Sequence, residues 1–250
     1  MSCVRSEMRE ADLRTGEADN QMILIVMTAY GHDKYLERAI AGIVCQEYQD
    51  WSMIIVDNGS TDKTAEILKE IQDPRIQVLT LKENIGFGGA VNKAILFSRM
   101  IKLDYDAFTC ICDDDFYYEH WLSTLVPFLK EADLVYSAYR FCPEIGEKYS
   151  SIPKIQAEYE PNKLIMGNFI GITRIWTRKL LDKVGMFEHT ACEDYDYWLR
   201  CEEKGARFKY IPIELADYLV GTNSWSYTHA KELITETQKV QERALSRRSK

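Results

Sequence analysis

Four short apolar runs, each followed by a polar loop and a segment of helical periodicity, dominate the first half of the chain. The apolar runs occupy residues 22–27, 52–56, 76–81 and 107–112, and the helical patterns follow at 32–46, 61–71, 88–101 and 120–130. Continuous apolar runs of this length are typical of strands buried on both faces of a parallel sheet. Alternation with helices requires right-handed crossovers, so the sequence predicts a Rossmann-like α/β unit with a mainly parallel central sheet flanked by helices.

The second half of the chain has a less regular pattern. We expect strands at 134–139, 170–176 and 207–211, helices at 178–184, 193–204 and 229–246, and a loop or flap over 140–163. The resulting division is a mobile tail at 1–20, one α/β domain at 21–228 and a charged C-terminal helix at 229–250.

Polar loops follow all four strands of the first half. They are Thr28–Gly31, Asp57–Asp62, Asn84–Asn92 and Asp113–Asp115. Ligands of open parallel sheets bind beyond the carboxyl ends of the strands, so we expect these loops to converge on one edge as a ligand site.

Three adjacent aspartates, Asp113–Asp115, end the fourth apolar run. A divalent cation such as Mg²⁺ or Mn²⁺ prefers oxygen ligands and often combines one or two carboxylates with substrate phosphates. The alternative is a solvated helix start, where negative charge suits the helix dipole. That alternative does not require three aspartates at the end of a buried strand.

Other motifs have structural alternatives of their own. The glycines of Gly86–Gly89 are compatible with a phosphate cradle or with a tight turn, and the Asp57–Gly59 stretch is a good turn before a helix. Glu193 and Asp194 open a helical pattern, where a carboxylate is either a general base for a substrate hydroxyl or a favourable charge in the first turn.

The charge balance excludes one class of partner. The net charge is −8 and the pI is about 5.2, whereas nucleic-acid binding needs a basic footprint.

Seven cysteines without a C-x-x-C pair indicate free thiols in a reducing compartment. The polar first 20 residues do not resemble a secretory signal, and the longest apolar run is too short for a bilayer, so we expect a cytoplasmic protein. The basic residues of 243–250 either favour the helix end or attach the chain to an anionic membrane face.

Five motifs in order resemble the family 2 inverting glycosyltransferases, which have the GT-A fold, over most of residues 22–226. They are T-A-Y-G-H-D from Thr28, I-I-V-D-N-G-S-T-D from Ile54, N-I-G-F-G-G-A-V-N from Asn84, D-D-D from Asp113 and E-D-Y-D-Y-W-L-R from Glu193. The resemblance implies transfer of a sugar from a nucleoside-diphosphate sugar to an acceptor hydroxyl. The implied donor is a UDP-sugar or, alternatively, a dTDP-sugar, and the implied acceptor is a glycan or lipid-linked sugar.

The resemblance also implies a role for each matching residue. Asp194 would be the catalytic base, and Asp113 and Asp115 would bind Mn²⁺ or Mg²⁺. Thr28, Ala29 and Tyr30 would line the nucleotide base, and Asp57 would accept a hydrogen bond from it. Further substrate-binding candidates are Asn58, Asn84, Gly88, Asn92, Asp113, Asp114 and Glu193, with Gly167, Asn168 and Trp176 on the acceptor side.

Two departures from the family pattern concern the diphosphate. Val91 stands where many members have an arginine, and Gly221 stands where we expect a histidine, for which His229 would substitute only if the loop folds back. These departures keep open a non-catalytic subunit that binds sugar nucleotides. A nucleotidyltransferase is a further alternative, against which the absence of a basic glycine-rich loop near the N-terminus counts.

Overall fold

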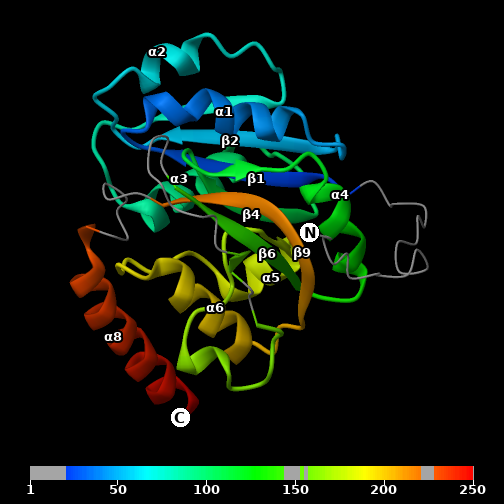
Figure 1. Cartoon of the computed structure of the whole chain (residues 1–250), viewed down its shortest axis with the longest axis vertical. Coiled ribbons are helices and arrows are strands. Elements are labelled where there is room, and N and C mark those ends of the chain that lie inside the picture. The colour runs from blue at the N-terminus through cyan, green and yellow to red at the C-terminus, as the bar shows by residue number, and fades with distance from the viewer. Residues whose placement is uncertain (1–20, 144–152, 155–156, 221–227, 250) are drawn as a thin grey trace, which may run out of the picture.

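The computed structural model describes residues 21–143, 153–154, 157–220 and 228–249. A single mixed sheet runs through the molecule, with helices on both faces (Figure 1). Its strands follow the order β3-β2-β1-β4-β8-β6-β9-β5, and β7 pairs with β6. The strands are β1 (Ile23–Ala29), β2 (Trp51–Asp57), β3 (Ile76–Thr80), β4 (Ala107–Cys112), β5 (Phe116–Tyr117), β6 (Leu134–Pro143), β7 (Pro153–Lys154), β8 (Arg174–Thr177) and β9 (Phe208–Val220).

The first four strands pair in parallel, as the alternating pattern predicts. Thr28 lies opposite Val56 of β2 and Cys112 of β4, and Asp57 lies opposite Thr80 of β3. The carboxyl ends of these strands are therefore level. This register confirms that the polar loops after them share one edge of the sheet.

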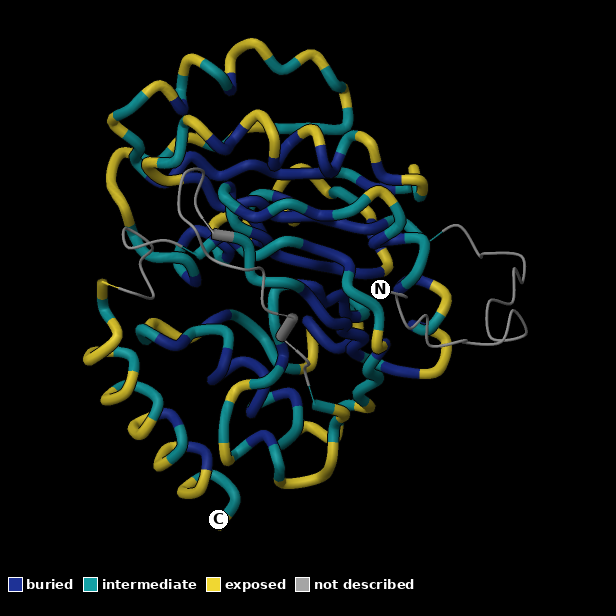
Figure 2. Tube along the Cα trace, in the orientation of Figure 1, coloured by how far each residue is buried: buried dark blue, intermediate teal, exposed yellow. Residues whose placement is uncertain are grey.

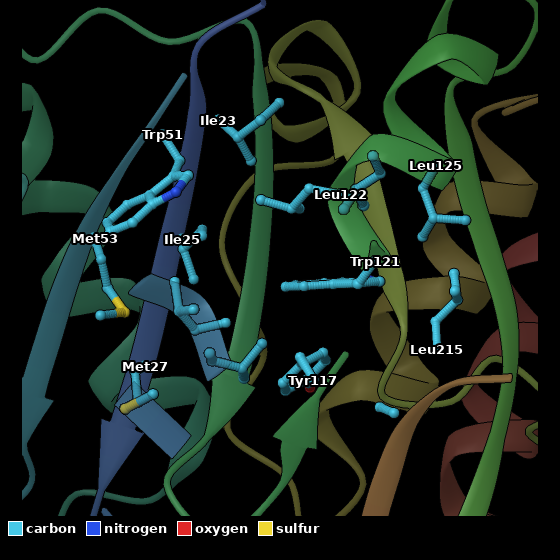
Figure 3. Close-up of a cluster of buried hydrophobic side chains, with 14 of the residues drawn as sticks. Ile23, Ile25, Met27, Trp51, Met53, Tyr117, Trp121, Leu122, Leu125 and Leu215 are labelled. Carbon is cyan, nitrogen blue, oxygen red and sulfur yellow. The ribbon is translucent and has the colours of Figure 1, made fainter. Parts of the chain in front are cut away.

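Two core clusters lie on opposite faces of the sheet because alternate side chains of each strand point to opposite sides. Figure 3 shows one cluster, in which Ile23, Ile25 and Met27 pack with Trp51 and Trp121. Helices α1 (Asp33–Val44), α2 (Thr64–Lys69) and α4 (Trp121–Leu125) supply residues to this cluster. The other cluster receives α3 (Phe87–Met100), α5 (Arg178–Val184), α6 (Glu193–Glu203) and α8 (Ala230–Arg248). Figure 2 shows the buried strands between these exposed helix faces.

Several predicted elements need correction. The helix expected over 120–130 ends at Leu125 and continues as the 3-10 helix η2 (Val126–Lys130), because Pro127 has no N–H to donate to an α-helical turn. The strand expected at 170–176 begins only at Arg174. Regular structure also enters the segment expected to be a loop, since β6 extends to Pro143 and pairs with β7. Residues 144–152 and 155–156 of that segment, and the tail at 1–20, lie outside the described residues.

The C-terminal helix α8 packs against α6. Val240 and Ala244 are fully buried in the second core cluster. Arg247 pairs with Glu203 at 2.8 Å and with Asp196 at 3.4 Å, and Arg248 pairs with Glu202. Two cations of the basic C-terminal segment are thus neutralised within the protein. No helix in the described part of the chain is long and apolar enough to cross a bilayer.

Candidate active site

A cleft of about 420 Å³ opens at the carboxyl ends of the parallel strands. Its lining combines side chains from the loops after β1, β2, β3 and β4 with side chains from β8 and the start of α6. The predicted residues that line it are Thr28, Tyr30, Asn58, Asn84, Asp113, Asp114, Glu193 and Asp194. The fold therefore brings Asp113 and Asp114 of the acidic cluster into one cleft with the predicted base, whereas Asp115 is buried and does not line the cleft.

Asp113 links the acidic cluster to the loop after β1. Its two carboxylate oxygens accept hydrogen bonds from the backbone N–H of Tyr30 and from Nδ1 of His32, each at 2.9 Å. The bond to Asp113 raises the pKa of His32 to about 9, so this imidazole carries a positive charge at neutral pH. Asp113 thus holds the β1 loop and a cation against the end of β4.

Asp115 has one unsatisfied buried oxygen. Its Oδ1 accepts the Leu219 N–H at 3.3 Å, whereas Oδ2 has no hydrogen-bond partner among the described residues. Burial raises the pKa of Asp115 well above its usual range and raises that of Asp114 to about 6. A buried carboxylate without a partner is costly, and a bound cation removes that cost.

Two groups of side chains have the spacing that a metal ion requires. One contains His32, Asp113 and Asp114, and the other contains Cys112, Asp114 and Asp115. Neither group contains both Asp113 and Asp115, the predicted metal pair, while Asp114 belongs to both. Burial raises the pKa of Cys112 well above its usual range, which keeps the thiol neutral and leaves the carboxylates as the ligands suited to a hard cation.

Asp194 lies in the first turn of α6, on the wall of the cleft formed by the C-terminal half. Its Oδ2 accepts a hydrogen bond from Asn168 Nδ2 at 3.1 Å, and its Oδ1 accepts one from the Tyr195 N–H at 2.7 Å. The side-chain oxygen of Asn168 is in turn fixed by the Ile170 N–H at 3.2 Å. This chain of bonds orients the Asp194 carboxylate without placing a cation in contact with it.

Glu193 joins α6 to the glycine-rich loop. Its Oε1 accepts the Gly88 N–H at 3.4 Å at the start of α3, and burial raises its pKa. A Cβ on Gly88 would lie 3.0 Å from Glu193 Cγ and 3.1 Å from Phe187 Cβ. The glycine at this position therefore allows α6 to approach α3 closely.

The loops after β2 and β3 lock together through two asparagines. Asn58 Nδ2 donates to Asn84 Oδ1 at 3.0 Å, and Asn58 Oδ1 accepts the Ile85 N–H at 3.1 Å. Gly59 has a φ of +79°, and a Cβ there would lie 2.6 Å from the backbone carbon of Glu83. Gly59 therefore suits this position for two reasons: its backbone is left-handed, and it passes close to the backbone of Glu83.

Gly59→Ala is expected to lower the free energy of unfolding by more than about 2 kcal/mol, since the φ strain adds to a backbone clash. Equilibrium urea unfolding measures this loss. Gly205→Ala is the matched control, because Gly205 has a φ of +71° but nothing within 4 Å of its Cβ position. It should lose only about 1 kcal/mol. Equal losses in the two variants would show that the approach to Glu83 is easily relieved.

Other predicted residues lie beside the cleft or away from it. Ala29 and Asp57 are buried. The Ala29 carbonyl accepts the Asn58 N–H at 2.9 Å, and Asp57 Oδ1 accepts the Ser60 N–H at 2.9 Å. Asn92 exchanges two hydrogen bonds of 2.9 Å with the backbone of Phe187. Trp176 is fully buried against Phe108 and Trp198, so it belongs to the core and not to the cleft lining. Gly167 does not line the cleft and is next in sequence to Asn168.

Of the two positions that depart from the family pattern, the structure describes only Val91. Val91 is fully buried in the second core cluster. Gly221 lies outside the described residues, and His229 occupies the N-cap position of α8 without lining the described cleft.

Two cationic residues line the cleft but were not predicted as site residues from the sequence. His32 lines it, as does Arg174, which is only 5% exposed and donates to the Gly171 carbonyl at 3.0 Å. The signal for His32 was its place directly after the first polar loop. Arg174 had no local signal, because it lies within an apolar strand whose neighbours in the sheet are distant in sequence.

The fold is that of a GT-A glycosyltransferase, with a mainly parallel sheet whose strand ends lie at one edge. The family profile described as "Glycosyl transferase family 2" matches residues 24–188. The chain belongs to glycosyltransferase family 2.

Individual relatives agree with this assignment. The chain is 27% identical over 227 residues to the Escherichia coli UDP-Glc:alpha-D-GlcNAc-diphosphoundecaprenol beta-1,3-glucosyltransferase WfaP, covering 87% of this chain and 84% of WfaP. Among solved structures, S. aureus TarS with UDP-GlcNAc superposes with a TM-score of 0.66 at 16% identity, covering 86% of this chain and 66% of TarS. The mannosyltransferase PcManGT of Pyrobaculum calidifontis, in complex with GDP-Man and Mn²⁺, gives 0.65 at 15% identity, with coverages of 87% and 63%. This chain thus spans just under two thirds of these two neighbours.

Proposed function

We propose that this protein transfers a sugar from a nucleoside-diphosphate sugar to an acceptor hydroxyl with inversion at the anomeric carbon. The observation that carries the proposal is the cleft that Asp194 shares with Asp113 and Asp114 of the acidic cluster. Asp194 is the general base that takes the proton of the attacking hydroxyl. The opposite wall of the cleft holds the diphosphate leaving group, so attack and departure occur on opposite sides of the sugar.

Asp114 and Asp115 are the proposed ligands of a divalent cation, Mn²⁺ or Mg²⁺. The unsatisfied Oδ2 of Asp115 and the shared place of Asp114 in both candidate groups support this choice over Asp113. Such a cation, when bound, stabilises the charge that develops on the leaving diphosphate. Asp113 instead positions Tyr30 and His32, since both its oxygens accept hydrogen bonds from these residues.

Further residues in the cleft and beside it position the substrates and the base. Asn168 orients the base through its bond to Asp194. Positive charge on His32 and Arg174 offsets part of the acidic charge and supplies cations to a cleft that has Val91 in place of the family's arginine. Val91 in place of an arginine was one reason to consider a non-catalytic subunit that binds sugar nucleotides. Cations from other elements of the cleft weaken that reason.

A UDP-sugar is the proposed donor, with a dTDP-sugar as the second choice. TarS was solved with UDP-GlcNAc, and WfaP is named for UDP-Glc and a lipid-diphosphate-linked acceptor, whereas PcManGT was solved with GDP-Man. By analogy with WfaP, the acceptor is a glycan or a lipid-linked sugar. The proposed location is the cytoplasm, with contact to the membrane face where a lipid-linked acceptor would lie.

The test is a thermal-shift screen of UDP-, dTDP- and GDP-sugars with and without Mn²⁺, followed by an assay of nucleotide release. A ligand at one hundred times its Kd stabilises the folded state by about 2.7 kcal/mol, so the true donor should raise the melting temperature clearly and only with metal. NMR of the transferred product should show the anomer opposite to that of the donor. Retention of the anomer would disprove inversion. The absence of both shift and nucleotide release would disprove the proposed function.

A further inference from the structure

A second hollow, of about 500 Å³, lies outside the transfer cleft. It is bounded by helix α1 and by the segment 116–120, which starts directly after the acidic cluster. The two hollows have no lining residue in common. The second hollow is therefore a separate feature of the surface.

Three rings form a row along this hollow. The ring centroids of Phe116 and Tyr118 are 6.2 Å apart, and those of Tyr118 and His120 are 6.0 Å apart. Phe116 and Tyr118 are alternate residues that start in strand β5 and therefore share one side, whereas His120 joins the row from the turn that follows. Tyr117 lies between them in sequence but packs in the core, with its ring centroid 4.2 Å from that of Trp121 (Figure 3).

Small residues of α1 give the hollow its depth. Ala41 is exposed, and a Cβ on Gly42 would lie 3.0 Å from the Tyr117 carbonyl oxygen and 3.3 Å from the Phe116 ring. The helix therefore approaches the aromatic segment closely at Gly42 and leaves space above Ala41. A long side chain at position 41 would occupy that space.

The rim of the hollow carries polar groups of both signs. The Arg38 guanidinium lies 5.1 Å from the centroid of the Phe116 ring, and Glu119, which also lines the hollow, is exposed. Near Tyr118, Arg140 is already paired with Asp217 at 2.8 Å. The opposite charges balance, so the rim suits a neutral ligand with hydroxyl groups better than an anion or a cation.

We propose that this hollow binds a pyranose unit of a glycan. The C–H groups on one face of a pyranose ring pack against aromatic faces, which carry the negative part of the ring quadrupole. The polar rim then orients the sugar hydroxyls, as the few polar groups of an apolar pocket orient a ligand. Identification of this glycan as the acceptor chain rests on the proposed function, whereas binding itself does not.

The experiment follows the aromatic NMR signals of the full chain while maltotriose, cellotriose and chitotriose are added at millimolar concentrations. No sugar nucleotide or metal is present, so the result is independent of transfer activity. At least one trisaccharide should shift the ring signals of Phe116 and Tyr118. Ala41→Gln should weaken that binding about tenfold or more by filling the hollow. Ala65→Gln, the same change on helix α2, should leave it within about twofold.

Three outcomes would overturn the proposal. The first is the absence of any shift with all three sugars. The second is equal binding by the Ala41→Gln and wild-type proteins, which would put the sugar elsewhere. The third is a shift with 1-hexanol but with none of the sugars, which would make the hollow a docking groove for apolar chains.

Discussion

Asp194→Asn is expected to lower the rate of sugar transfer by about 10²- to 10⁴-fold, the usual contribution of a general base. Asn keeps the shape of the side chain and an oxygen that accepts the Tyr195 N–H, but it cannot take a proton from the acceptor hydroxyl. In the proposed arrangement the nucleotide contacts the opposite wall of the cleft, so its affinity should stay within about twofold. Transfer rates at saturating donor, together with calorimetric titration of the nucleoside diphosphate, measure the two effects.

Asp104→Asn is the matched control for this substitution. Asp104 is exposed and does not line the cleft. Its variant should transfer sugar at the wild-type rate. Normal transfer by Asp194→Asn would disprove the base assignment, and a parallel loss of nucleotide affinity would mean that Asp194 contributes to donor binding instead.

Asp115→Asn is expected to abolish the stabilisation by Mn²⁺ and to lower transfer by about 10²-fold or more, because one carboxylate ligand and its charge are lost. At a metal concentration one hundred times the wild-type Kd, the wild-type protein should gain about 2.7 kcal/mol of stability and the variant close to none. The variant should still fold, since its amide oxygen can accept the Leu219 N–H in place of Oδ1. Thermal melting with and without Mn²⁺ measures the difference.

Comparison of Asp113→Asn with Asp115→Asn distinguishes a metal site that uses Asp115 from one that uses Asp113. Asp113→Asn removes the charge that holds His32, and both oxygens of Asp113 already accept hydrogen bonds, whereas Asp115 Oδ2 accepts none among the described residues. The Mn²⁺-dependent stabilisation of the Asp113→Asn variant should persist in part. If Asp113→Asn abolished that stabilisation while Asp115→Asn retained it, the metal would belong to the group containing His32.

Much of the fold could be predicted from the chain because its signals are local. Strand β4 and helix α5 have the predicted bounds, and β1, β2 and α3 differ from prediction by one or two residues at each end. These elements have unbroken apolar runs or clear helical periodicity, which require no knowledge of distant residues. Convergence of the loops was predictable for a similar reason, since parallel strands all point their carboxyl ends toward one edge.

The errors in the strands occur where distant partners decide the structure. Strand β5 has only two residues and exists because Phe116 and Tyr117 pair with β9, about a hundred positions later in the chain. Strand β8 is shorter than its apolar pattern suggests, because it pairs with β6 only from Arg174 onward and with β4 only at Trp176 and Thr177. Such pairings leave no periodic signal in a short segment.

The amino-acid sequence alone determined the order of strands and helices, the common edge of the polar loops and the types of side chain available there. Only the tertiary structure decided how those side chains are used: both oxygens of Asp113 are engaged, one oxygen of Asp115 is left unsatisfied, Asn168 holds Asp194, and a cation within an apolar strand reaches the cleft. The physical reason is that periodicity arises between neighbours in the chain, whereas hydrogen bonding and burial depend on groups that meet only after folding.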